Sequence, residues 1–150
     1  MCIFFQLFEI IYNMLKRFII YGLLGWNMEV IWTGLTSFSA ENINLIGHTS
    51  VWMFFVYGSA VFIFEPVYRI IADCNTFVRG CAWMALIFVI EFISGMILRS
   101  IGIEAWYYDC RFSVCGVIRL DYAPAWFAVG LIFEKVNQIL LNYNIGVKQK

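Results

Sequence analysis

The chain has 150 residues, of which 63% are hydrophobic, 19% aromatic and only 13% charged, and its formal net charge is zero. An average soluble domain carries about 25% charged and about 45–50% apolar residues, and a fold of this size leaves roughly a third of its unfolded surface exposed to water. This composition excludes an ordinary water-soluble domain and indicates an integral membrane protein. The balanced charge gives no indication of a nucleic-acid partner.

The first segment, residues 1–17, reads "MCIFFQLFEIIYNMLKR". Its apolar part is about 15 residues long, shorter than the ~20 residues that a helix needs to cross a bilayer. Its basic pair, Lys16 and Arg17, follows the apolar run, whereas a secretory signal peptide places its basic residues before the run. We therefore expect a short interfacial helix here, and no cleaved signal peptide.

Four long apolar runs follow, and each is close to the ~20 residues that cross ~30 Å of hydrocarbon. Backbone polar groups cannot stay unpaired in lipid, so the runs are predicted to be helices. The sequence thus predicts an all-α, polytopic membrane protein with a four-helix transmembrane bundle. The predicted transmembrane domain is 18–141, followed by a polar tail, 142–150, and its runs lie at about 18–38, 50–71, 80–98 and 117–140.

Proline and basic residues add detail to this topology. Pro66 and Pro124 lie inside the second and fourth runs, where we expect a kink at each. Most basic residues lie at the amino terminus, in the middle connection and at the carboxyl terminus, which share one side if there are four spans. The positive-inside rule then predicts that both termini are cytoplasmic, in a membrane that the sequence does not identify. The basic residues on that side are Lys16, Arg17, Arg69, Arg79, Lys135, Lys148 and Lys150.

Each predicted span contains one glutamate, and these are Glu29, Glu65, Glu91 and Glu134. Each also has a glycine four or seven residues away, on the same helix face. Small residues let membrane helices approach closely. A charge at the centre of a span costs on the order of 2.5–3.5 kcal/mol, so four carboxylates facing lipid would cancel much of the favourable insertion energy. We therefore expect the four glutamates to face a shared polar interior, protonated, paired or hydrated.

Arginines near these glutamates are candidate partners. Arg69 follows Glu65 by four residues, and Arg99 stands eight residues after Glu91. The interior cluster is therefore predicted to include Arg99. A second polar and aromatic set is predicted at the outer mouth, where Arg119 and Asp121 are close enough to pair; it comprises Trp106, Tyr108, Asp109, Arg119 and Asp121.

The glutamate-bearing stretches also resemble one another. "AVFIFEPVYRI" aligns with "AVGLIFEKVNQI" when one inserted residue is allowed, and "EVIWTG" has the same place in its hairpin as "EFISG". A duplicated helical hairpin explains this similarity, and so does the low complexity of apolar sequence. Both explanations stay open.

Cysteine and histidine usage argues against metal and cofactor chemistry. The five cysteines form no C-x-x-C pair, and the single histidine, His48, just precedes the second run. No Glu-x-x-His, Walker or dinucleotide-binding motif occurs. No catalytic residue, metal or cofactor is predicted. Cys110 and Cys115 share one loop, where they are expected as free thiols unless that loop faces an oxidising compartment.

Several stretches together resemble a known family. "YGLLGWNMEVIWTG", "GHTSVWMFFVYGSAVFIFEPVYR", "EFISGMILR", "AWYYD" and "GVIRLDYAPAWFAVGLIFE" look like the animal transmembrane protein 229 family, which is similar to the bacterial CmpB-like family of ABC-transporter permeases. The resemblance covers residues 18–136 and implies a small polytopic membrane protein. Where the family usually reads Asp-Tyr after Trp106, this chain has Tyr107 and Tyr108. The motif-like positions are Glu29, Glu65, Glu91, Arg99, Trp106, Tyr108 and Glu134.

Three functions are compatible with these features. The first is a transporter-like protein or transporter subunit whose acid-lined interior binds or conducts a small cationic or protonatable species. The second is an intramembrane enzyme acting on lipid, with a glutamate as general acid/base and Arg99 or Arg119 holding a head-group phosphate. The third is a structural or regulatory membrane subunit. The expected partners are the lipid bilayer and a second copy or another membrane subunit.

Overall fold

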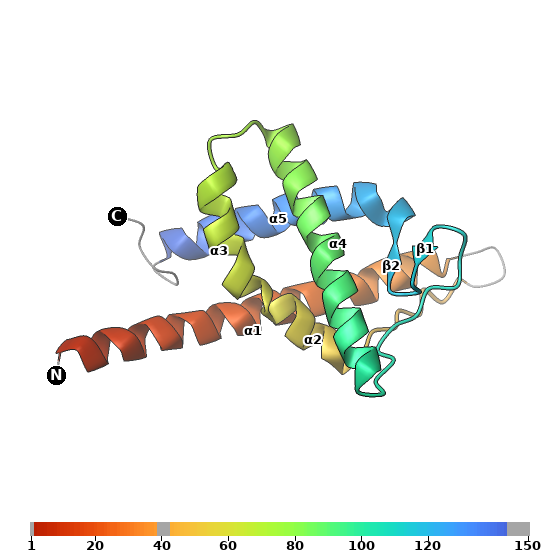
Figure 1. Cartoon of the computed structure of the whole chain (residues 1–150), viewed down its shortest axis with the longest axis horizontal. Coiled ribbons are helices and arrows are strands. Elements are labelled where there is room, and N and C mark those ends of the chain that lie inside the picture. The colour runs from red at the N-terminus through yellow and green to blue at the C-terminus, as the bar shows by residue number, and fades with distance from the viewer. Residues whose placement is uncertain (1, 39–42, 144–150) are drawn as a thin grey trace. The chain divides into compact units, whose positions relative to one another are not determined.

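The computed structural model describes residues 2–38 and 43–143, without the side chains of Cys2, Ile3 and Glu65. Figure 1 shows that helices dominate these residues. The chain divides into two compact units, one up to Val61 and one from Phe62.

The first unit is built from two helices, α1 (Cys2–Thr36) and α2 (Val51–Gly58). The predicted interfacial segment and the first predicted span are joined in α1, which runs for 35 residues. No proline or polar turn interrupts the sequence at residue 17, so nothing ends the helix there. Ser50 begins α2, because its hydroxyl accepts a hydrogen bond from the backbone N–H of Trp52 at 3.3 Å.

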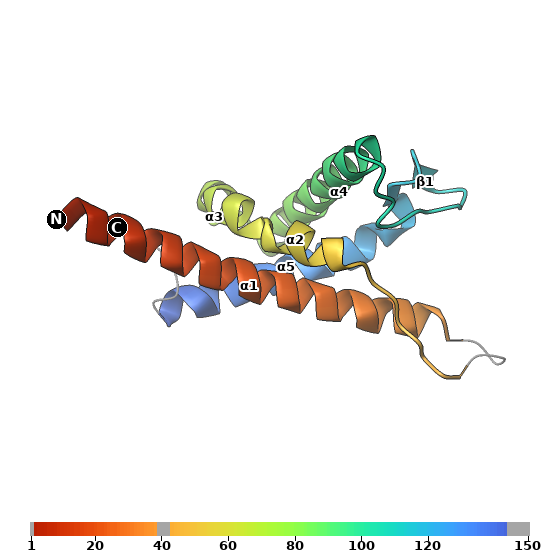
Figure 2. The same cartoon turned by 90° about the horizontal axis from the view of Figure 1, so that it is seen from below.

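Glycines on α1 allow α2 to pack directly against it, and Figure 2 shows the two helices side by side. Gly22 lies against Phe54, and Gly25 lies against the ring of Tyr57. A methyl group at either position would overlap these atoms. Gly22 and Gly25 of the first predicted span therefore lie on the face of α1 that packs against α2. The Phe18 ring meets Phe54 edge-to-face, with 5.9 Å between centroids.

The second predicted run is divided by a break at Ser59, which separates α2 from α3 (Ala60–Ile71). The backbone N–H of Ser59 satisfies the carbonyls of Phe55 and Tyr57. Pro66 lies inside α3, and the helix continues across it. The run is thus divided seven residues before Pro66, and the kink that we predicted at this proline stays a prediction.

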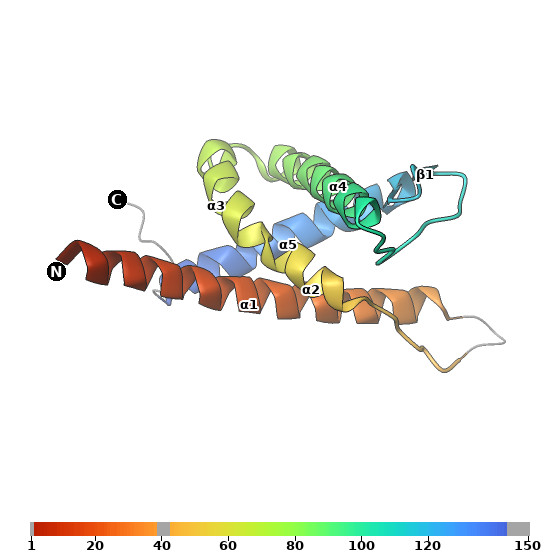
Figure 3. The ribbon, with the colours of Figure 1, turned by 60° about the horizontal axis from the view of Figure 1, so that its bottom comes forward.

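The second unit contains most of α3 and the 25-residue apolar helix α4 (Thr76–Ser100). Asn75 caps α4, because its Oδ1 accepts a hydrogen bond from the N–H of Val78 at 3.0 Å. Beyond α4 come two short antiparallel strands, β1 (Ser113–Val114) and β2 (Ile118–Arg119), and a 3₁₀ turn, η1 (Leu120–Tyr122). Figure 3 shows this hairpin between the end of α4 and the start of the last helix.

The last helix, α5 (Ala123–Asn142), begins six residues later than the fourth predicted run. Residues 118 and 119 belong to β2, so the helix cannot include them. Pro124 stands at the start of α5, where its missing N–H would have had no helical partner. It begins this helix, and the predicted kink inside a longer helix is wrong.

Helices α4 and α5 cross each other, as Figure 1 shows. Their close approach depends on glycine, because Gly80 of α4 lies against the ring of Phe127 and Gly130 of α5 lies against Trp83. Phe64 stacks on Trp83 with 4.2 Å between ring centroids. These aromatic contacts form the core of the second unit.

Within the described ranges, α4 is the one helix that is both long enough and apolar enough to cross a bilayer. Helices α2 and α3 have only 8 and 12 residues, whereas α1 and α5 carry several charged or amide side chains. The chain is therefore all-α with one clear candidate span. On α4 itself, Val89, Ile93 and Ile97 are exposed, and Ile97 is 57% accessible.

Candidate functional site

Two of the predicted interior glutamates, Glu91 on α4 and Glu134 on α5, are buried, with only 5% and 4% of their surfaces exposed. Their neighbouring glycines, Gly95 and Gly130, are buried on the same faces. Both side chains are therefore buried within the second unit. Glu29 is half-buried on α1, and the side chain of Glu65 lies outside the described part of the chain.

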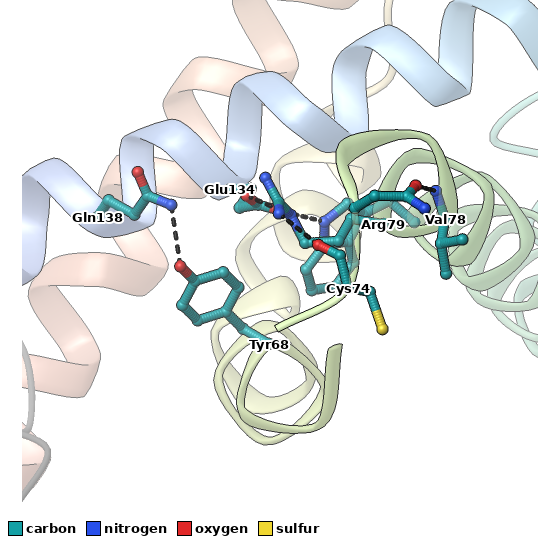
Figure 4. A network of polar contacts seen from close by, with 8 residues as sticks. Tyr68, Cys74, Val78, Arg79, Glu134 and Gln138 are labelled. Carbon is teal, nitrogen blue, oxygen red and sulfur yellow. Dashed lines mark hydrogen bonds and ion pairs between the residues drawn. The ribbon is translucent and has the colours of Figure 1, made fainter. Parts of the chain in front are cut away.

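The first polar cluster surrounds Glu134 and joins α4 to α5 (Figure 4). Arg79 Nε donates to both carboxylate oxygens, at 3.1 and 3.2 Å, and Trp83 Nε1 donates to Oε2 at 2.7 Å. Arg79 Nη1 also donates to the carbonyl of Cys74 at 2.8 Å, which ties the α3–α4 turn to the same group. We call Arg79, Trp83 and Glu134 the Glu134 cluster. Its carboxylate is charge-balanced and has at least three donated hydrogen bonds.

Further polar side chains lie on the same part of α5. Gln138, one turn after Glu134, donates from Nε2 to the hydroxyl of Tyr68 on α3 at 3.0 Å. Asn137 is fully buried. Burying a side-chain amide without a hydrogen bond costs free energy, so the burial of Asn137 indicates that its side chain has a polar partner. This face of α5 holds α3 and α4 in register through polar bonds as well as through packing.

The second polar cluster lies about the middle and the end of α4. The hydroxyl of Tyr108 donates to Glu91 Oε1 at 3.1 Å. Arg99 donates from Nη1 to the carbonyl of Cys115 at 2.6 Å and from Nη2 to that of Gly116 at 3.0 Å. We use the name Glu91 cluster for these residues: Glu91, Gly95 and Arg99 on α4, and Tyr108, Cys115 and Gly116 in the loop. The predicted approach of Arg99 to Glu91 is replaced by a role in fixing the loop.

The two clusters are separated along α4. Arg79 and Trp83, which hold Glu134, precede Glu91 by twelve and eight residues, or about 18 and 12 Å along the helix axis. Glu91 and Glu134 therefore belong to different polar networks. Each of the two carboxylates has its own hydrogen-bond partners, and the shared centre of four glutamates stays a prediction.

The predicted outer-mouth residues have separate roles. Arg119 and Asp121 form the predicted ion pair, with Nη2 and Oδ2 2.6 Å apart, and Arg119 Nη1 donates to the hydroxyl of Tyr122. The hydrogen bonds from Arg119 hold the pKa of the Asp121 carboxyl below its usual value. Asp109 is exposed. Trp106 Nε1 donates to the carbonyl of Val117 at 2.8 Å.

A family comparison covers almost all of these residues. The family model described as "Putative ABC-transporter type IV" matches residues 16–149. This chain belongs to that family. No solved structure matches the fold.

The match to the type IV ABC-transporter family includes both clusters and their helices. Sequence reasoning identified Glu91, Glu134 and Arg99 but missed Arg79 and Trp83. Arg79 and Trp83 are four residues apart and therefore lie on one face of α4. That spacing is the one local sign in the sequence that they contact the same partner. Their common partner on α5 is 51 residues beyond Trp83, so only the fold reveals it.

The four cysteines whose side chains the structure describes are free thiols, and Cys110 and Cys115 are exposed. No group of three or more histidine, cysteine or acidic side chains suited to a metal ion occurs in that part of the chain. The arrangement offers buried carboxylates held by tyrosine, tryptophan and arginine, which is chemistry for binding or relaying a proton or a small cation.

Proposed function

We propose that this protein is a multi-pass membrane protein with a transporter-like role, in which Glu91 binds a proton or a small cation. The single observation that carries the proposal is a buried carboxyl group in the middle of α4, the one described helix that is long and apolar enough to cross a bilayer. Glu91 lies about 22 Å from Thr76 and about 14 Å from Ser100 along α4. An ionisable side chain at such a depth is costly and is typical of ion paths and proton relays.

The family match supports a transporter-like role, and the contacts of Glu91 and Glu134 support a different role for each carboxylate. Glu134 is held by the Arg79 cation and by Trp83, so its role in the proposal is to join α4 and α5. Glu91 accepts from the phenol of Tyr108, a group that can both donate and accept a hydrogen bond. A carboxyl–phenol pair is suited to passing a proton.

The proposal retains four crossings, with both termini in the cytoplasm, and places the chain with the transmembrane protein 229 family. The burial pattern of α5 supports its crossing despite its polar composition. Glu134 and Asn137 are buried in the unit, whereas Ile132 and Ile139 are exposed. The exposed Lys135 has a flexible stem that can extend its charge toward the interface. The polar content of α5 thus leaves an apolar face for lipid.

Proton flux into liposomes tests the proposed function. The purified protein is reconstituted into vesicles containing a pH-sensitive dye, and a potassium gradient with valinomycin supplies the membrane potential. We expect flux above that of empty vesicles for the wild type, a large loss for Glu91→Gln, and partial recovery for Glu91→Asp. Sodium uptake is measured in parallel to identify a cation other than the proton.

Glu9→Gln is the matched control, because Glu9 is an exposed glutamate on α1 and undergoes the same chemical change. Its flux should equal that of the wild type. Wild-type vesicles that carry neither protons nor sodium would contradict the proposal. So would a folded Glu91→Gln protein with undiminished flux, which would instead favour a structural subunit.

A further inference from the structure

The loop after α4 covers the face of the helix that carries Glu91. Glu91, Gly95 and Arg99 are four residues apart and therefore form one stripe on α4. Tyr108 lies on the first of them, and the side chain of Val117 lies on the second. Val117 is fully buried. The stripe is thus covered along its length by chain that follows it in sequence.

The carbonyl of Gly116 is the junction that orients this loop. It accepts one hydrogen bond from Arg99 Nη2 and another from the backbone N–H of Tyr108, each at 3.0 Å. The second arm of Arg99 holds the neighbouring carbonyl of Cys115. A planar guanidinium with two separated donors fixes both the position and the direction of the peptide that it binds. Arg99 therefore connects the end of α4 directly to the residue that positions Tyr108.

Gly116 is required at this junction by its conformation and by its surroundings. Its φ is +67°, which side-chain-bearing residues adopt at a cost. A methyl group there would lie 2.5 Å from the ring of Tyr107 and 3.1 Å from Arg99 Nη2. The Arg99 guanidinium also lies over the Tyr107 ring, 5.2 Å from its centroid. Glycine, arginine and tyrosine thus fit one another closely.

A second hydrogen bond fastens the loop from the other side. The indole of Trp106 donates to the carbonyl of Val117, next to the junction. Trp106 and Tyr108 are therefore both bonded to the 116–117 segment, through a side chain and through the backbone. These two hydrogen bonds restrain the loop, and the restrained loop holds the Tyr108 hydroxyl on Glu91.

We infer that Arg99 and Gly116 are positioning residues that hold the Tyr108 hydroxyl on Glu91, so that residues 101–119 form a cover over this carboxyl. The inference rests on the proposed function of Glu91 as the ion-binding group. A carboxyl covered in this way exchanges its proton or cation when Tyr108 moves. The contacts of Arg99 with the two carbonyls then set how readily the cover opens.

Chemical modification of Glu91 tests the cover independently of transport. Dicyclohexylcarbodiimide is apolar and adds to protonated carboxyl groups, and mass spectrometry of the peptide containing residue 91 measures the rate. We expect Arg99→Ala to raise this rate by about tenfold, the ratio that ~1.4 kcal/mol produces. Gly116→Ala should act in the same direction.

Arg111→Ala is the matched control, since Arg111 is an exposed arginine of the same loop. Its rate should equal that of the wild type. If Arg99→Ala does not fold, Arg99→Lys serves instead: it keeps the charge but has one nitrogen, and it should raise the rate to a lesser extent. Equal rates in the wild type and in a folded Arg99 variant would overturn the inference.

The two proposals fail in different ways. Wild-type vesicles without flux, together with faster modification in Arg99→Ala, would reject the transport role and support the positioning role. Flux that depends on Glu91, together with unchanged modification rates in the Arg99 and Gly116 variants, would support transport and reject the cover.

Discussion

Replacing Arg79 with methionine tests whether the Glu134 cluster holds α4 against α5. The change removes the cation and leaves the buried carboxylate of Glu134 with Trp83 as its remaining donor within this cluster. Breaking a buried ion pair from one side typically costs 3–5 kcal/mol. The Arg79 side chain is 21% exposed, so some solvent screening remains, and we expect about 3 kcal/mol, at the lower end of that range.

The double variant Arg79→Met, Glu134→Gln gives the sharper result. Glutamine is neutral and keeps an oxygen that can accept the indole hydrogen bond of Trp83. Neutralising the carboxylate removes the penalty for an unbalanced buried charge, so the double variant should be more stable than Arg79→Met alone. A second substitution that recovers stability is the signature of a coupled pair.

Unfolding in mixed micelles by titration with sodium dodecyl sulfate, followed by far-ultraviolet circular dichroism, measures these free energies. Asp121→Asn is the control, because it breaks the exposed ion pair with Arg119 and should have a far smaller effect. The reasoning is refuted if the free energy of unfolding of Arg79→Met lies within about 0.5 kcal/mol of the wild-type value, which is the usual range for a surface substitution. It is also refuted if the double variant is no more stable than Arg79→Met alone.

Two further predictions concern packing and topology. Gly130→Val should destabilise the second unit by about 1–3 kcal/mol, because its side chain would overlap Trp83, whereas Ala128→Val on the exposed side of α5 should be tolerated; the same titration measures both. If α4 crosses the bilayer, an impermeant maleimide added outside sealed cells should label Cys110 and Cys115 and leave Cys74 unlabelled until the membrane is permeabilised. Labelling of all three in sealed cells would contradict a crossing by α4.

Local sequence was a good guide wherever a helix depends on its own residues. The apolar run at 80–98 lies within α4, because a long apolar run without proline can continue as one helix and Asn75 supplies the cap. The glycines beside Glu91 and Glu134 correctly marked buried faces, since spacing of four places residues on one side of a helix. The predicted pairing of Arg119 with Asp121 is confirmed. Local sequence suffices for this prediction, because the two residues are only two positions apart.

Local pattern is a poor guide where another part of the chain competes for the same backbone or side chain. Local pattern predicts a kink at Pro124 because residues 117–122 are apolar enough to extend the helix, yet residues 118 and 119 pair with β1 as β2, and residues 120–122 form η1. Arg99 was assigned to Glu91 by distance along α4, but the loop carbonyls at 115 and 116 bind its guanidinium. Neither competing partner is visible from local pattern.

The sequence by itself determined that this is an apolar, helical, membrane-type chain and which acidic residues are costly enough to require a partner. Composition and spacing suffice for those conclusions, because the transfer of a side chain from water and the periodicity of a helix are local properties. Tertiary structure alone decided which partner each carboxylate has. Arg79 and Trp83 reach Glu134, and Tyr108 reaches Glu91, across 17 to 55 residues of chain. Such pairs form because burial penalises an unsatisfied polar group wherever its partner lies in the sequence.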